Sequence, residues 1–243
     1  MKKIHLFLLA ATAVSFSACK KTNDITTTPT YKCATCKTTP DAVAANDASN
    51  KGIYKGVMIG STGTIVFNLA NSGTTITALM VIDGVTINLT STVSIIAGQT
   101  YVAPFTGTLS GSPVSITFSV GAIGANPTVT TSSIPGHPGS VFSIIKENSA
   151  YLLECFEGVY STTKPETGTF NFMLSRGLKV YSGVSRKDNS TSTGTFDGTI
   201  NANNELLDNS GQKVFGKLVG DNMVGTFLDG NGSTVTLTSK RTF

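Results

Sequence analysis

Cys33 and Cys36 are the first candidates for chemistry in this sequence, because two intervening residues is the spacing of redox pairs and of half a zinc site. A redox pair belongs to an α/β context that this chain lacks, and attachment of a c-type haem needs a histidine where Lys37 stands. Zinc needs two further ligands, and the only histidine and cysteine downstream are His137 and Cys155, far away in sequence. We therefore predict no metal and no cofactor, but a structural disulfide, either Cys33–Cys36 or one of the two joined to Cys155.

His137 is the second candidate, and the only other histidine is His5. One interpretation is that His137 acts as a general base on a rigid loop. The other, favoured by the surrounding Gly and Pro, is that it is a turn residue between Pro135 and Pro138. The chain has no Gly-x-Ser-x-Gly elbow, and one histidine supports neither a Ser-His-acid triad nor a multi-histidine metal site.

Paired carboxylates would be needed for glycoside hydrolysis. Glu154 and Glu157 are three residues apart in an expected strand, so their side chains should face opposite ways. Glu147 and Glu166 are candidates without a partner in the pattern. The sequence therefore predicts that the protein is not an enzyme, with a hydrolase as the weakest alternative.

The segment 229–233 begins like a calcium-binding loop, with Asp229 in its first position. Such a loop needs Gly at its sixth position and Glu at its twelfth, where this chain has Thr234 and Lys240. A hairpin turn explains the segment instead.

Composition excludes a nucleic-acid partner. Only 13% of the residues are charged, and the formal charge of +4 falls to +2 without Lys2 and Lys3, the two lysines of the first 18 residues, which contain no acid. No lysine or arginine cluster is long enough to hold a phosphate backbone. The absence of tryptophan also weakens a carbohydrate-binding reading, and core or edge packing is expected for four tyrosines: Tyr54, Tyr101, Tyr160 and Tyr181.

The elements that must position these residues are strands. Apolar and polar residues alternate over 85–90, 114–120 and 235–238, which is typical of strands with one apolar face. Asp-Gly and Asn-Gly pairs of the kind found in tight hairpins separate such segments. The pattern predicts an all-β fold, an antiparallel β-meander that forms a sandwich or a barrel.

An internal repeat divides this region. The segments 52–54 and 63–69 have counterparts about 105 residues later at 158–160 and 168–174. In both copies the first segment reads Gly-x-Tyr, and the second begins with Gly-Thr and continues with alternating apolar residues. We therefore expect two related halves, 51–150 and 151–243.

The N-terminus has the parts of a secretory signal over residues 1–18: Lys2 and Lys3, an apolar stretch from Ile4 to Phe16, and small residues before the cut. The apolar stretch is shorter than the roughly 20 residues that span a bilayer. The signal therefore indicates export rather than a transmembrane helix.

Phe16-Ser17-Ala18-Cys19 resembles the lipobox of bacterial lipoproteins, although the family usually carries Leu at its first position. The resemblance implies that Cys19 receives a diacylglycerol, becomes the first residue of the mature chain and anchors it to a membrane. The Ser-Ala-Cys ending followed by Lys20 is similar to that of envelope lipoproteins from Bacteroidota. Lys20 in place of Asp implies the outer membrane, and the single acid Asp24 after Cys19 favours the periplasmic face over the cell surface.

Residues 19–50 read as a disordered, lipidated tether that carries the cysteine pair and a short helix. The stretch 20–30 is polar and threonine-rich and cannot bury enough apolar surface to fold. Thr39-Pro40-Asp41 has a cap residue, a first-turn proline and an acid, and predicts a helix start that runs on towards Ala45.

Three functions follow from these features. The first is a non-catalytic binding or assembly role at the cell envelope, with a protein partner or a small apolar ligand. The Gly-x-Tyr strand openings resemble the Gly-x-Trp of lipocalins, which implies the second, a barrel that carries a small apolar ligand in its mouth. The third is a hydrolase.

Overall fold

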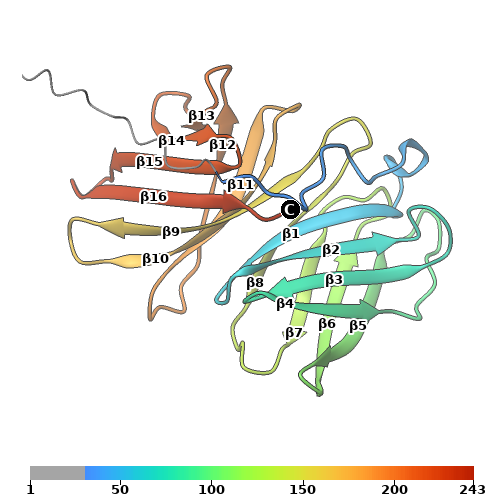
Figure 1. Ribbon diagram of the computed structural model, residues 1–243. Helices are drawn as coiled ribbons and strands as arrows, with labels where there is room; N and C mark the ends of the chain where they lie inside the picture. Colours follow the sequence, from blue (N-terminus) through green and yellow to red (C-terminus); the bar gives the residue numbers. More distant parts are fainter. Residues whose placement is uncertain (1–30) are drawn as a thin grey trace, which may run out of the picture.

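The computed structural model describes residues 31–243 and is all-β, as the alternation predicts. Residues 1–30, with the predicted signal and Cys19, lie outside the described residues. From Gly52 onwards the described residues form two sets of strands (Figure 1). The first set is β1 (Gly52–Ile59), β2 (Gly63–Leu69), β3 (Ile76–Ile82), β4 (Val85–Thr90), β5 (Tyr101–Leu109), β6 (Ser112–Val120), β7 (Thr128–Ser133) and β8 (Val141–Lys146). The second is β9 (Glu154–Thr162), β10 (Thr167–Ser175), β11 (Val180–Lys187), β12 (Gly194–Ile200), β13 (Glu205–Asp208), β14 (Val214–Val219), β15 (Asn222–Leu228) and β16 (Thr234–Arg241).

The two sets share one antiparallel meander order and differ in closure. In the first, β8 pairs with β1, and the sheet stays open because β7 and β8 approach without pairing. In the second, β16 pairs with β9 in the equivalent place and the sheet closes into an eight-stranded barrel. No helix among residues 31–243 is long and apolar enough to cross a membrane.

Equivalent apolar residues of the sequence repeat point into the two cores. Phe67 of β2 lies in the first core and Phe172 of β10 lies in the barrel core. The Gly-x-Tyr part of the repeat is not in matching register, however. Tyr54 pairs with Phe67, whereas Phe172 pairs with Phe156 and not with Tyr160.

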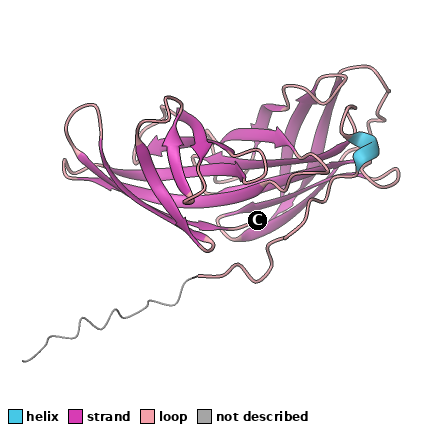
Figure 2. Cartoon of the chain, turned by 90° about the horizontal axis from the view of Figure 1, so that it is seen from above, coloured by secondary structure: helices cyan, strands magenta, loops and turns pink. Residues whose placement is uncertain are grey.

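Strand β1 is buried on both faces along its whole length. Tyr54 and Met58 point into the first core, and the alternate residues Val57 and Ile59 pack against the outer face of the barrel. Figure 2, seen from above, shows the two sets of strands lying against each other. The buried side-chain amide of Asn171 on β10 donates to the Met58 carbonyl at 2.6 Å and adds a polar link across this junction.

Residues 31–50, the described part of the predicted tether, are packed against the folded strands. The Tyr31 hydroxyl donates to the Arg241 carbonyl at 3.0 Å, and the Cys33 amide donates to Asp221 at 2.8 Å. Asn46 and Asn50 are buried. This segment is therefore part of the folded structure.

The helix predicted to start at Thr39-Pro40-Asp41 is wrong. The structure has only a 3-10 turn over Ala44–Asn46. The amides of Asp41 and Ala42, which would open the helix, donate instead to the Glu147 carboxylate at 2.8 and 3.2 Å. Long-range side-chain bonds thus hold the segment in an extended path that local capping residues do not reveal.

Gly183 on β11 is required for the tight packing of the barrel wall. A Cβ there would lie 2.5 Å from the Asn171 carbonyl oxygen and 2.5 Å from the Phe196 ring. We expect Gly183→Ala to lower the free energy of unfolding by about 1–3 kcal/mol, measured by urea unfolding, because the added methyl forces the wall apart. Gly230→Ala is the control, since its Cβ would have no atom within 4 Å. Equal stability of the two variants would contradict this reading of the wall.

Candidate functional site

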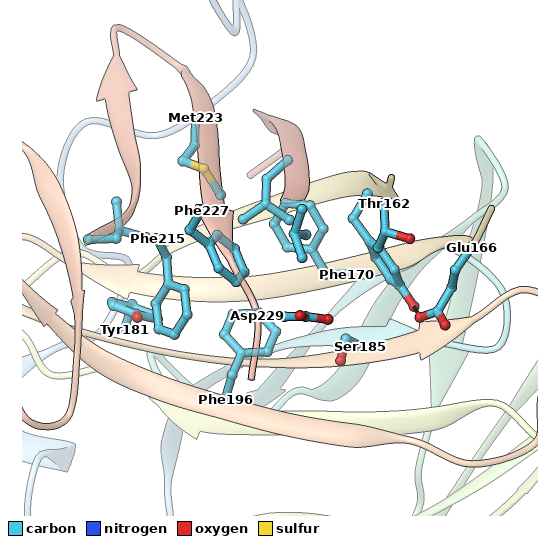
Figure 3. Close-up of a pocket in the computed structure, with 14 residues that line it drawn as sticks. Thr162, Glu166, Phe170, Tyr181, Ser185, Phe196, Phe215, Met223, Phe227 and Asp229 are labelled. Atoms are coloured by element: carbon cyan, nitrogen blue, oxygen red, sulfur yellow. Dashed lines mark hydrogen bonds between the residues drawn. The ribbon is translucent and has the colours of Figure 1, made fainter. Parts of the chain in front are cut away.

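The barrel contains a cavity of about 270 Å³ at one end of its lumen (Figure 3). This end is formed by the loops 163–166, 188–193, 209–213 and 229–233. Most of the residues around the cavity are aromatic or aliphatic. The lining consists of Tyr160, Thr162, Glu166, Phe170, Tyr181, Ser185, Phe196, Leu206, Phe215, Met223, Phe227, Asp229, Val235 and Leu237.

The cavity has a closed floor and an accessible mouth. Phe156 and Phe172 stack below it with ring centroids 4.8 Å apart and are fully buried. Tyr160, Phe196 and Phe227 are only partly buried, which places the opening at the loop end. The barrel is therefore filled at one end and hollow at the other, as small ligand-binding barrels are.

Inward strand positions build this lining. Along each strand alternate residues face the lumen, so Phe170 and Phe172 of β10 point inward while Asn171 points to the junction with β1. The Phe215 and Phe227 rings meet edge to face, with centroids 4.9 Å apart.

Polar groups at the mouth are partly bonded to one another. The Tyr160 hydroxyl donates to Glu166 at 3.3 Å, and Lys187 pairs with the same carboxylate at 2.9 Å. The Lys187 hydrogen bond lowers the pKa of Glu166. Burial and the nearby Glu166 charge raise the pKa of Tyr160 to about 12, so this tyrosine is a neutral donor near neutral pH.

Asp229 also lines the cavity, from the turn between β15 and β16. Its Oδ1 accepts the amides of Asn231 and Ser233 at 2.9 and 2.7 Å, which is the bonding of a hairpin turn. Its carboxylate extends towards the side of the cavity where Ser185 lies (Figure 3). The turn predicted for 229–233 is present, and it also delivers a carboxylate to the lumen.

The predicted disulfide is present between Cys33 and Cys36. Cys155 is a free, buried thiol. It packs with Val57 and Met173 in the apolar cluster between β1 and the outer face of the barrel, here called the junction cluster. Burial raises the pKa of Cys155 to about 12, so the reactive thiolate is scarce near neutral pH. Neither the pair nor Cys155 lines the barrel cavity.

His137 lies in the loop between β7 and β8, and the structure brings two polar side chains to it. Its Nδ1 is 2.6 Å from Ser61 Oγ and 3.5 Å from Asp83 Oδ2. A Ser-His-acid relay needs the hydroxyl and the carboxylate on different ring nitrogens. Here both approach Nδ1, so the three residues hold a surface loop and are not arranged as a relay.

The candidate acids are dispersed. Glu154 pairs with Arg176 at 2.9 Å, while Glu157 accepts the Thr62 hydroxyl at 2.8 Å on the junction side. Glu147 is buried in an ion pair with Lys55. Within residues 31–243, no group of three or more His, Cys, Asp or Glu side chains is placed to hold a metal ion.

Sequence reasoning brought out part of the cavity and missed the rest. Tyr160 and Tyr181 line it, whereas Tyr54 and Tyr101 are buried in the first core, as expected of packing residues. The phenylalanines of the lining were not recognised as a set. The recurring Gly-Thr-Phe at 194–196 and 225–227 was the available signal, because both phenylalanines face the lumen.

Comparison with known proteins adds no assignment. No protein family model matches the chain, and no significant match was found among curated proteins or among solved structures.

Proposed function

We propose that this protein is a non-catalytic binding protein of the cell envelope, in which the β9–β16 barrel holds a small apolar ligand. The observation that carries the proposal is the cavity of about 270 Å³ inside a closed barrel, with an aromatic lining and a mouth at the loop end. This proposal combines two predictions from the sequence: the lipocalin-like carrier of a small apolar ligand and the location in the cell envelope.

The size and chemistry of the cavity support this function. Ligand pockets typically measure about 300–1,000 Å³ and combine an apolar lining with a few polar groups. At about 270 Å³ the cavity is slightly smaller than that range, which indicates a ligand of one ring or a short chain. An apolar cavity holds water poorly and gains from being filled by an apolar molecule.

The address rests on the sequence features of residues 1–30. A lipid on Cys19 would anchor the protein to the outer membrane, facing the periplasm. The Cys33–Cys36 disulfide is consistent with an oxidising compartment. Mass spectrometry of the protein purified from its own cells should find the chain starting at Cys19 with acyl chains attached. A chain that retains Met1 would contradict the anchor.

Filling the cavity tests the binding function. Ser185 lines the lumen on β11, so Ser185→Phe should occupy much of the free volume and abolish binding of indole, a neutral apolar probe of suitable size. Isothermal titration calorimetry of the original and variant proteins would measure this. Saturable indole binding to the original barrel is expected first.

Thr195→Phe is the matched control for Ser185→Phe. Thr195 is exposed on β12, next to the lumen residue Phe196, and pairs with Val184, whose side chain packs outside the barrel. This variant should bind indole like the original protein. Loss of binding in both variants, or in neither, would contradict binding in the lumen.

A further inference from the structure

The charged groups of the cavity lining all have one sign. Among residues 31–243, Glu166 and Asp229 are the only ionisable acids or bases on it besides the tyrosines, and no lysine, arginine or histidine of this part lines it. An apolar cavity that offers carboxylates and no cationic side chain disfavours an anionic ligand. This observation bears on which ligands the proposed cavity would select.

The two carboxylates differ in what they can still bind. Glu166 is already paired with Lys187 through Oε2 and accepts the Tyr160 hydroxyl through Oε1. Asp229 uses Oδ1 for the turn amides of Asn231 and Ser233, and no hydrogen bond from the described residues reaches its Oδ2. Asp229 therefore keeps one carboxylate oxygen free at the cavity.

Three lysines lie in the loops of the mouth or at the end of β11 beside them, and groups of the chain itself engage their ammonium groups. Lys164 donates to the Asn231 carbonyl at 3.2 Å, and Lys187 is held by Glu166. The Lys213 ammonium lies 4.7 Å from the centroid of the Phe227 ring and donates to the Leu228 carbonyl. None of these lysines lines the cavity, and each ammonium group already has a partner in the chain.

The aromatic rings supply a second attraction for a cation. The faces of Phe and Tyr rings are negative and attract ammonium groups within about 6 Å. Lys213 already uses the Phe227 ring in this way from outside the lining. The rings of Phe170 and Phe196 also line the cavity, as Asp229 does.

We propose that the cavity selects an organic monocation: an ammonium group that meets the free oxygen of Asp229, carried on a small aromatic or aliphatic body that fills the space between the rings. This inference rests on the proposed binding function and names its ligand class. No covalent step is involved, since the ligand is held by charge, ring faces and apolar burial.

Three probes of similar size test it by calorimetric titration: 2-phenylethylammonium, the neutral 2-phenylethanol and the anion phenylacetate. We expect the ammonium to bind about tenfold more tightly than the alcohol, and phenylacetate to bind most weakly, because one charge interaction in a partly buried site has about that effect. Raising the salt concentration should narrow the gap between ammonium and alcohol, because the interaction is electrostatic.

Asp229→Asn tests the residue, because asparagine keeps the Oδ1 acceptor that the turn uses. The variant should lose the tenfold preference for the ammonium over the alcohol, since the negative charge is removed. Asp197→Asn is the control. Asp197 is exposed on β12 and does not line the cavity, so its variant should keep the preference.

The outcomes separate the two proposals. Equal binding of ammonium and alcohol, tighter binding of phenylacetate, or a preference that survives Asp229→Asn would overturn the cation selectivity and leave the apolar cavity as the binding site. Binding of none of the three probes, nor of indole, would overturn the proposed function as well.

Discussion

Replacing Glu147 by alanine is expected to lower the free energy of unfolding by about 3–5 kcal/mol, because it removes the nearer and fully buried counter-charge of a buried lysine. The Lys55 ammonium is fully buried and lies 2.6 Å from Glu147 Oε1, with Asp41 Oδ2 at 3.4 Å and the Phe243 ring centroid at 4.8 Å. The Glu147 carboxylate also accepts the Leu153 amide at 3.1 Å. Urea unfolding followed by circular dichroism measures the loss.

The effect is large because Glu147 joins three parts of the chain. It bonds the segment at Asp41 and Ala42, strand β1 at Lys55 and the connection to the barrel at Leu153. Removing it leaves the buried Leu153 amide and the partly buried amides of Asp41 and Ala42 without this acceptor. A fully buried donor that loses its partner costs about 1–3 kcal/mol. We therefore expect the packing of the N-terminal segment to be lost together with stability.

Two comparisons make this prediction sharp. Glu166→Ala removes a similar pair, with Lys187 at 2.9 Å, but at a mostly exposed site where the expected loss is at most about 1 kcal/mol. Lys55→Met combined with Glu147→Leu should recover part of the loss, because neither charge of this pair then stays buried. A Glu147→Ala loss no larger than that of Glu166→Ala would contradict the role given to the buried pair.

Phe172→Ala is the second change with a large expected effect, about 3–5 kcal/mol of the free energy of unfolding. The Phe172 ring is fully buried at the floor of the barrel, 4.8 Å from the Phe156 ring and 6.2 Å from the Tyr181 ring, measured between centroids. Its removal opens a void that the closed strands cannot collapse to fill, because the barrel is hydrogen-bonded all round.

Phe215→Ala is the matched control for Phe172→Ala. Phe215 lines the cavity and is only partly buried, so its truncation should cost about 1–2 kcal/mol while it weakens indole binding. Thermal and urea unfolding of both variants measure the difference. Equal losses for the two would mean that the floor of the barrel is not its packed core.

The strand content and the disulfide could be predicted from the sequence because their signals are local. Alternation over 114–120 needs only neighbouring residues, and the Cys33–Cys36 pair is close in sequence. That residues 31–50 are ordered could not be predicted. Their packing depends on partners such as Glu147 and Asp221, which are more than a hundred residues away from the groups they bond. The helix predicted at Thr39-Pro40-Asp41 was wrong for the same reason, since local propensity does not include these distant partners.

The cavity could not be predicted from the alternation of apolar and polar residues. Inward positions of a strand look alike whether the lumen they face is filled, as at Phe172, or hollow, as at Phe196. Closure of the second sheet and openness of the first arise from the same meander order, so the sequence repeat could not distinguish them. The register difference between Tyr54 and Tyr160 is likewise set by pairing across strands.

The methionines allow the central claim, a ligand held inside the barrel, to be tested directly. Met223 lines the cavity, whereas Met58 and Met80 lie in the first core and Met173 lies in the junction cluster. Magnetic resonance of isotope-labelled methionine methyl groups during titration with 2-phenylethanol should move the Met223 signal in a saturable way and leave the other three in place. A Met223 signal that stays still while the probe binds, or shifts confined to Met58, Met80 or Met173, would contradict the account.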